Sequence, residues 1–436
     1  RVLFVKGAPE IIASFCDIAP DARKEIADRL HGYQNQAMRT LAFAYRVLAD
    51  GEQPDMGAIA GGVKLTFQAV AAISDPIRAD VPDAVKQCID AGIQVKIVTG
   101  DTSATAIEIA RQIGIWDKDT PAEAQITGPD FAALSDDEAF QRVVKLRVMS
   151  RARPTDKQRL VNLLQKHNAV VAVTGDGTND APALHHAHVG LSLGSGTSVA
   201  KEASDMTLID DSFRSIVNAV MWGRSLYKNI QRFLFFQLVV NVTALLLVLG
   251  GSVIGTELPL TVTQILWVNL IMDTFAALAL ASLPPSREVM KDKPRKQTDF
   301  IITKGMAKGI VFIGVAFFAV LFAFLIHCNQ SSGNLHVHEL SLFFTTFVML
   351  QFWNLFNAKA FGSNHSAFHA FTHDNGLLLV LLIILGGQWI IVTFGGKMFR
   401  TDPLSLTEWA TIIASTSLVL WIGEIWRAVK RLKCKQ

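Results

Sequence analysis

Cysteine is scarce in this sequence and charged residues are few. The 436 residues contain four cysteines, Cys16, Cys88, Cys328 and Cys434, which lie far apart and form no Cys-x-x-Cys pair. Neither a thiolate metal centre nor a disulfide framework is therefore indicated, and the usage fits a reducing cytoplasm. Charged residues make up 18% of the chain and the formal net charge is only +3, so nothing indicates nucleic-acid binding.

A phosphate-binding loop of the Gly-x-x-x-x-Gly-Lys-Ser/Thr type is also absent. What is present is a β-branched run, 169–173, followed by a glycine-rich turn that carries the carboxylates Asp176 and Asp180. Such a run predicts a buried parallel strand, and ligands of open α/β sheets bind beyond the carboxyl ends of the strands. Asp176 is therefore expected where a bound phosphate and Mg²⁺ meet.

Two other segments repeat this arrangement. The run 95–98 leads into Thr99-Gly100-Asp101, and the segment 151–157 supplies the cations Arg151 and Lys157. Thr99 and the neighbouring backbone amides suit phosphate oxygens, and Lys157 can neutralise charge that develops on them. We expect three such pieces on one parallel sheet to form a phosphoryl-transfer site, although the sequence points to no nucleophile.

The segment Thr174-Gly175-Asp176-Gly177-Thr178-Asn179-Asp180-Ala181-Pro182 resembles the hinge motif of P-type ATPases, whose phosphorylation domain has a haloacid-dehalogenase-like fold. Lys6-Gly7-Ala8, Asp75-Pro76-Ile77-Arg78, Thr99-Gly100-Asp101 and Lys157 occur in that family's order. The resemblance implies a phosphate site shaped by Thr99, Gly100, Asp101, Lys157, Asn179 and Asp180, with Mg²⁺ held partly by Asp176. It also implies ATP contacts from Lys6, Arg39, Asp75, Arg78 and Arg151.

Three motifs of that family are missing, namely Asp-Lys-Thr-Gly-Thr, the Thr-Gly-Glu actuator loop and Pro-Glu-Gly-Leu. We therefore expect the C-terminal half of a pump whose N-terminal half carries the phosphorylated aspartate. The expected domains are part of a nucleotide-binding domain (1–76), an incomplete phosphorylation domain (77–211), and a stalk with a membrane domain (212–436). The isolated chain is expected to bind nucleotide without forming a phosphoenzyme or pumping.

Long apolar runs predict an all-α membrane domain after the α/β part. A helix pattern over 216–236 continues into six candidate spans: 233–254, 260–281, 306–327, 340–356, 376–394 and 410–425. Lys and Arg crowd the second inter-span loop and follow the last span, whereas 329–339 has none. The positive-inside rule then places both ends in the cytoplasm, with the lipid bilayer as a partner. A multi-pass protein of a bacterial plasma membrane is expected.

Asn269 and Asp273 lie four residues apart near the middle of the second span. A carboxylate at that depth costs several kcal/mol unless it is protonated, paired or bound to a cation, so a transport site is expected. Asn241 in the first span can face this pair, and Gln351 in the fourth adds an oxygen, although interhelical hydrogen bonding explains Gln351 nearly as well. Hard oxygen ligands suit Ca²⁺.

The segments 267–280 and 237–244 resemble the plasma-membrane-type calcium pumps. Reticulum-type pumps have a glutamate where this chain has Ala244 and another at Gln351, so the resemblance implies one ion per cycle. The implied function is ATP-driven Ca²⁺ export through an aspartyl-phosphate. The tail after Trp426 is too short to imply a calmodulin-binding extension.

Other hypotheses stay open. The cation could be Mg²⁺, Mn²⁺ or Na⁺, and the protein could be a nucleotide-regulated channel or secondary transporter. An anchored phosphatase requires an Asp-x-Asp pair at a strand end, and the only such triplet, Asp117-Lys118-Asp119, follows a helix pattern. The histidines 185, 186 and 188 fit a solvated helix face better than a metal site.

Overall fold

The computed structural model describes residues 1–35, 38–53, 57, 62, 64–73, 76–254, 259–332, 336–363, 365–369 and 375–433. The chain divides into two compact units. The first comprises Arg1–Ala219 and Met290–Gln297, and the second comprises Val220–Val289 and Thr298–Gln436. The domain boundaries predicted at 76/77 and 211/212 stay predictions.

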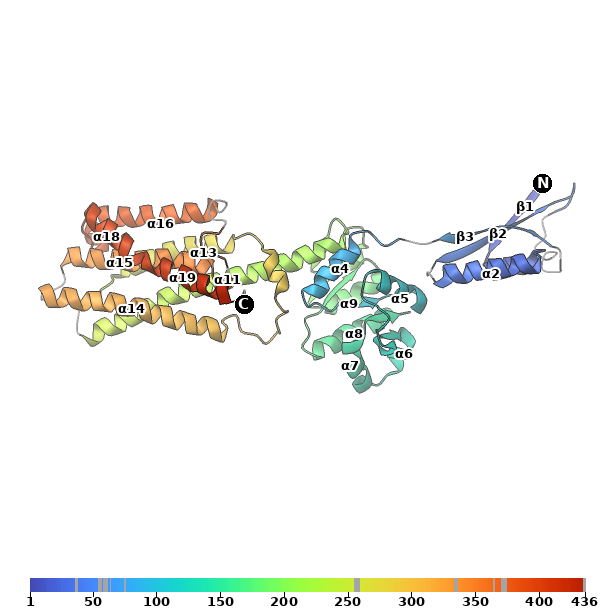
Figure 1. Ribbon diagram of the computed structural model, residues 1–436, viewed down its shortest axis with the longest axis horizontal. Coiled ribbons are helices and arrows are strands. Elements are labelled where there is room, and N and C mark those ends of the chain that lie inside the picture. The colour runs from blue at the N-terminus through green and yellow to red at the C-terminus, as the bar shows by residue number, and fades with distance from the viewer. Residues whose placement is uncertain are drawn as a thin grey trace. The chain divides into compact units, whose positions relative to one another are not determined.

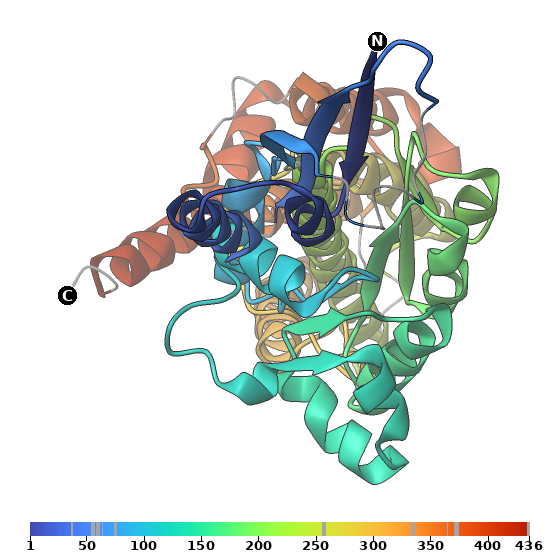
Figure 2. The ribbon, with the colours of Figure 1, turned by 90° about the vertical axis from the view of Figure 1, so that its right-hand side faces the viewer.

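The N-terminal segment forms a three-stranded antiparallel sheet in the order β1 (Val2–Gly7), β2 (Arg39–Val47), β3 (Thr66–Ile73). Helices α1 (Pro9–Phe15) and α2 (Pro20–Asn35) pack against it (Figures 1 and 2). The small core between helices and sheet contains Val5, Ile12, Cys16, Ala42, Ala44 and Leu65. The apolar run 2–5 lies within β1, and the polar run 22–30 lies within α2.

Alternating helices and parallel strands follow, as βαβ units require. The helices are α4 (Val81–Asp90), α5 (Ser103–Gln112), α6 (Gly128–Ala133), α7 (Asp136–Lys145), α8 (Pro154–Lys166), α9 (Ala181–His186) and α10 (Ser198–Glu202). The strands are β4 (Ile97–Val98), β5 (Gln125–Thr127), β6 (Val148–Ser150), β7 (Ala172–Gly175), β8 (Val189–Leu193) and β9 (Met206–Leu208). The predicted haloacid-dehalogenase-like α/β part is thus present, and Gly92, just beyond the C-terminal cap of α4, has a φ of +77° that suits glycine.

The expected single sheet is wrong in one respect. The strands pair as two three-stranded parallel sheets, β4-β6-β5 and β7-β8-β9. Both predicted strands are shorter than their apolar runs: β7 begins at Ala172, two residues after Val170, which is 59% exposed, and β4 begins at Ile97, just after Lys96. The Lys96 ammonium donates to the carbonyl oxygens of Val144, at 3.3 Å, and Leu146. Burial lowers the pKa of Lys96 to about 8, with a smaller contribution from Arg147.

The second unit holds six helical segments long and apolar enough to cross a membrane, as predicted. These segments contain α11 (Phe213–Val253), α12 (Val262–Leu266) with α13 (Asp273–Ala281), α14 (Lys304–Ser332), α15 (Val337–Lys359), α16 (Asn375–Phe394), and α18 (Leu406–Thr416) with α19 (Leu418–Lys433). Within this unit α13 to α16 lie side by side in the ribbon (Figure 1). The fourth segment, α15, is the most enclosed, with 78% of its apolar window buried.

Two of the six segments are not continuous α-helices. The second contains a π-helix, η3 (Trp267–Met272), between α12 and α13, and the last is interrupted at Ser417 between α18 and α19. The hydropathy pattern predicts the length of a span but carries no information on such local changes of helical pitch. The π-helix matters here because it contains Asn269 and is followed directly by Asp273.

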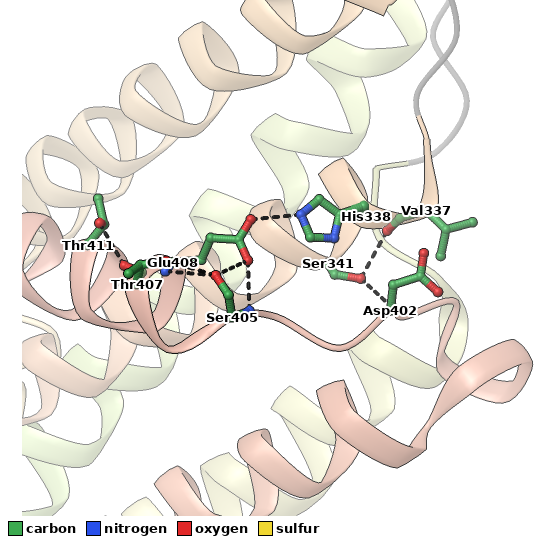
Figure 3. A network of polar contacts seen from close by, with 8 residues as sticks. All are labelled: Val337, His338, Ser341, Asp402, Ser405, Thr407, Glu408 and Thr411. Carbon is green, nitrogen blue, oxygen red and sulfur yellow. Dashed lines mark hydrogen bonds and ion pairs between the residues drawn. The ribbon is translucent and has the colours of Figure 1, made fainter.

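A polar network joins the beginnings of α15 and α18 (Figure 3). The imidazole Nε2 of His338 lies 2.8 Å from the Glu408 carboxylate, whose other oxygen accepts from the Ser405 hydroxyl in a capping box. The backbone N–H of Asp402 donates to the Ser341 hydroxyl at 2.8 Å. Because these bonds cross between the two segments, they fix α15 against α18 at one end of the bundle.

Two carboxylates organise the turn that precedes α11. Asp210 accepts from the Ser215 hydroxyl at 2.7 Å and from the Ser212 amide at 3.2 Å, and Asp211 accepts from the Ser195 amide at 3.1 Å. The hydrogen bonds from Ser215 and Ser212 lower the pKa of Asp210, and those from Ser195 lower the pKa of Asp211. Since the folded pKa values are depressed, this stabilisation is present above the unfolded pKa of about 4 and is lost as the pH falls through the folded values.

Replacing Asp210 by asparagine is expected to speed amide hydrogen exchange over residues 210–216 at pH 7 and to have a smaller effect at about pH 3. At the lower pH the parent carboxyl is itself becoming protonated, so the two proteins converge. Hydrogen exchange followed by mass spectrometry at both pH values measures this. An equal difference at both pH values would show that the charged form is not what stabilises the turn.

Candidate functional site

The ends of β4 and β6 bring two of the predicted segments together. The strands pair in parallel, with Ile97 opposite Val148 and Val98 opposite Met149. Beyond the strands, the Arg151 amide donates to the Asp101 carbonyl and the Ala152 amide donates to the Thr99 carbonyl, both at 2.9 Å. The turns 99–101 and 151–152 are therefore fixed against each other by their backbones.

Thr99 and Asp101 are also joined through their side chains. The Thr99 hydroxyl donates to Asp101 Oδ2 at 3.0 Å and accepts from the Asp101 amide at 3.1 Å. Gly100 between them has open space where a Cβ would lie, with no heavy atom within 4 Å. The turn therefore presents a hydroxyl and exposed backbone to the surface, which is the arrangement that can accommodate phosphate oxygens.

The third segment is connected through an ion pair. Lys157 lies in the first turn of α8, and its Nζ is 2.5 Å from Asp180 Oδ1. The Gly177 amide donates to Asp180 Oδ2 at 3.2 Å, and a Cβ at Gly175 would lie 2.4 Å from the Asp180 Cβ. Gly175 therefore leaves the room that the Asp180 side chain occupies. The lysine and aspartate side chains are only 17% and 15% exposed.

Asp176 differs from Asp180 in being exposed. Its backbone is fixed, because its carbonyl accepts from the Thr197 amide at 2.8 Å and Gly196 packs against it. An exposed carboxylate on a fixed turn at the end of a strand is a hard oxygen donor of the kind Mg²⁺ prefers. Asn179 is exposed in the adjoining 3₁₀ turn η2 (Thr178–Asp180).

The residues predicted to contact the nucleotide are less well defined. Lys6 is exposed near the end of strand β1, and Arg151 is exposed with a φ of 50°. Arg78 donates to the Asp211 carbonyl at 2.5 Å, which links it to the turn before α11. Asp75 and the Arg39 side chain lie outside the part of the chain that the structure describes. Nucleotide contact by these five residues stays a prediction.

The histidines near the hinge turn have local partners. His186 Nδ1 lies 2.9 Å from the Pro182 carbonyl, and the Val171 amide donates to His188 Nδ1 at 3.2 Å. Over the described ranges of the chain, no three His, Cys, Asp or Glu side chains are grouped in a way that could hold a metal ion. These contacts agree with the structural interpretation of the cluster.

The membrane unit buries the carboxylate of the second span. Asp273 is 2% exposed, and neither carboxylate oxygen has a hydrogen-bond partner among the described residues. Its backbone N–H donates to the Val268 carbonyl, five residues back, which is the π-helical spacing. A buried carboxylate without a partner is costly, so this geometry favours a bound cation or proton.

Gln351 is fully buried on α15, and both of its amide atoms lack a partner among the described residues. The same is true of Asn354, which the sequence argument missed. The two amides are three residues apart and share a helix face, so the spacing Gln351-x-x-Asn354 was the signal that could have found it. Interhelical hydrogen bonding therefore does not explain Gln351 within the described chain.

The other two predicted cation ligands behave differently. Asn241 on α11 and Asn269 in η3 are both exposed. The described helices thus enclose Asp273 and Gln351 but not Asn241 or Asn269. Side chains around Asp273 and Gln351 belong to one hydrophobic core, which contains Met272, Ala276, Leu350 and Leu355.

Replacing Asn354 by leucine is expected to raise the thermal unfolding midpoint of the membrane unit, because two buried amide atoms without partners disappear. Each such atom costs about 1–3 kcal/mol. If Asn354 also ligates the transported cation, the same variant needs a higher cation concentration for half-maximal activity. Thermal unfolding in detergent without cation measures the first effect, and activity against cation concentration measures the second. Destabilisation in the absence of cation would show that the amide has a partner in the working protein.

Comparison with known proteins agrees with this two-part architecture. A family profile described as haloacid dehalogenase-like hydrolase matches residues 6–188, and one described as cation transporting ATPase, C-terminus, matches residues 257–429. The chain belongs to the P-type cation-transporting ATPases.

Within that family, the chain is similar to calcium-transporting ATPases. It is 38% identical to calcium-transporting ATPase PAT1 of Dictyostelium discoideum over 98% of this chain and 42% of that protein. It is 38% identical to the probable plasma membrane-type calcium-transporting ATPase 8 of Oryza sativa subsp. japonica over 98% of this chain and 43% of that protein. It is 37% identical to plasma membrane calcium-transporting ATPase 3 of Homo sapiens over 99% of this chain and 38% of that protein. The chain spans about two fifths of the length of these relatives.

Proposed function

We propose that this chain forms the membrane and phosphate-handling part of a pump that exports Ca²⁺ at the expense of ATP through an aspartyl-phosphate. The observation that carries the proposal is the fully buried carboxylate of Asp273, without a partner in the described structure, in a chain of this family. Oxygen ligands favour Ca²⁺ over softer metals. The names of the relatives, all calcium-transporting ATPases, support the same cation.

In the α/β part, Thr99, Asp101, Lys157 and Asp180 would orient the transferred phosphoryl group. Lys157 keeps its ammonium near the hinge turn by pairing with Asp180, and the Thr99 hydroxyl lies in the turn beyond β4. Asp176 would hold Mg²⁺, which when bound supplies charge neutralisation to phosphate oxygens. Gly100 and Asn179 complete this set, and Lys6, Arg39, Asp75, Arg78 and Arg151 are proposed to contact ATP.

In the membrane part, Asp273, Gln351, Asn241 and Asn269 are the proposed ligands, with one cation per cycle. Transport further requires that the cation bind with different affinity in two states of the protein. The motifs for the phosphorylated aspartate and the actuator loop do not occur in residues 1–436, so we propose that an N-terminal half supplies them. The proposed location is a bacterial plasma membrane with both ends of this chain in the cytoplasm.

The proposal is tested on the whole pump in sealed vesicles. ATP hydrolysis and uptake of radioactive Ca²⁺ should both depend on Ca²⁺ and should both stop when Asp176 is replaced by asparagine. Stimulation by Mn²⁺ or Na⁺ in place of Ca²⁺ would keep the pump and change its cargo. Cation flux that persists after Asp176→Asn would instead favour the channel or secondary-transporter hypothesis.

A further inference from the structure

Three side chains attach the first half of the second membrane segment to the fifth segment and to the short helix that follows it. Thr263 donates to the Met398 carbonyl and Gln264 donates to the Phe399 carbonyl, each at 2.8 Å. Further along, the Trp267 indole N–H donates to the Gln388 side-chain oxygen at 3.1 Å. Met398 and Phe399 lie in α17 (Gly396–Phe399), and Gln388 lies in α16.

The contact at Trp267 is also a close steric fit. A Cβ at Gly387 would lie 2.3 Å from Cη2 and 2.8 Å from Cζ2 of the Trp267 indole. An indole ring is rigid, so it cannot make room by bending as a flexible chain end would. Glycine at 387 therefore permits the ring to lie directly on the α16 backbone, where Gln388, fully buried, holds its N–H.

The contact at Trp267 lies where the π-helical turn of the second segment begins. Trp267 is the first residue of η3, whose next residues include Asn269, and whose C-terminal cap is Asp273. A π-helix is rare, occurs mostly as a single turn inside an α-helix, and is frequent at functional sites. Anchoring its first residue to a neighbouring helix therefore determines where the residues of the turn lie.

We propose that the indole latch, defined as Trp267, Gly387 and Gln388, positions the π-helical turn and thereby determines the affinity of the Asp273 site for its cation. These three are positioning residues, since they act through the turn rather than by ligating the cation. The inference rests on the proposed function only for the statement that Asp273 binds the transported cation. The statement that the indole latch positions the π-helical turn does not depend on that function.

The fifth segment supplies a matched pair of substitutions. Gly386 has nothing within 4 Å of its missing Cβ, whereas Gly387 faces the indole. In the whole pump, Gly387→Ala is expected to raise the Ca²⁺ concentration for half-maximal ATP hydrolysis by ~10- to 100-fold, the size of effect seen when a metal ligand loses its support. Gly386→Ala carries the same change in helix propensity and should stay within about twofold of the parent.

Rescue separates a lost latch from a general packing defect. Trp267→Phe removes the ring atoms that a Cβ at 387 would strike, so the double variant Gly387→Ala with Trp267→Phe should recover much of the lost affinity. Gln388→Met keeps the side-chain length, removes the acceptor, and should give a smaller shift in the same direction. Maximal hydrolysis should change less than the half-maximal Ca²⁺ concentration in each case.

A second readout does not depend on transport. With the four native cysteines replaced by serine, Asn269→Cys is labelled with a maleimide, and Gly387→Ala should change the labelling rate whereas Gly386→Ala should not. If both labelling and half-maximal Ca²⁺ are unchanged in Gly387→Ala, the latch does not position the turn. If the parent shows no cation-dependent hydrolysis but labelling still responds, the proposed function fails and the positioning stands.

Discussion

Ca²⁺-stimulated ATP hydrolysis by the whole pump is expected to disappear in the variant Asp273→Asn at cation concentrations that saturate the parent. The carboxylate is buried, and neither oxygen has a partner among the described residues, so its charge is free to act on a cation. Loss of one partner of a buried charge pair costs about 2–5 kcal/mol, which corresponds to at least ~30-fold in affinity. ATPase activity against Ca²⁺ concentration measures this.

The same substitution is expected not to destabilise the protein without cation. An ionised carboxylate near the centre of a bilayer costs about 2.5–3.5 kcal/mol, and an amide of the same shape avoids that cost. The unfolding midpoint of Asp273→Asn should therefore equal or exceed that of the parent in chelator, and should respond less to added Ca²⁺. Asp402→Asn, at an exposed carboxylate of the same unit, is the control. Unaltered Ca²⁺ dependence in Asp273→Asn would remove this residue from the cation site.

Much of this architecture could be predicted because the relevant signals are local. The six membrane segments follow from runs of apolar residues, and the strand that ends at Gly175 follows from a β-branched run before a glycine turn. Asp176, Asp180 and Lys157 were predicted as one site, and the Lys157–Asp180 pair confirms that these two side chains meet. Each inference used residue type and spacing alone.

What could not be predicted depends on tertiary contacts. No pattern within 262–281 distinguishes the π-helix that begins at Trp267 from an α-helix, and the contact of Trp267 with α16 is a tertiary one. The burial of Asn354 and the exposure of Asn241 depend on how whole helices face one another. The division into two parallel sheets depends on which strands pair across the fold, and Lys96, just before β4, donates to carbonyl oxygens that lie 48 and 50 residues away.

Lys157→Met is expected to reduce ATP turnover of the pump by ~100- to 1,000-fold, the loss typical of removing one charged or hydrogen-bonding group that stabilises a transition state. The Lys157 side chain is only 17% exposed, and its ammonium lies 2.5 Å from the Asp180 carboxylate. The single variant also leaves Asp180 without its pair, which should lower the unfolding midpoint. Loss of activity alone would therefore not separate catalysis from stability.

The double variant Lys157→Met with Asp180→Asn makes that separation. Both charges are then absent, so the stability lost in the single variant should largely return. Turnover should stay ~100-fold or more below the parent, because the phosphate site still lacks the lysine ammonium. Lys145→Met is the matched control, since Lys145 lies 3.9 Å from Glu123 in a pair that is 71% and 62% exposed and contributes about 0–1 kcal/mol. Unfolding midpoints and ATP turnover of the four proteins provide the comparison. If turnover returned together with stability in the double variant, Lys157 would serve only to hold the hinge turn through Asp180. The positive charge at the phosphate site would then have to come from another residue.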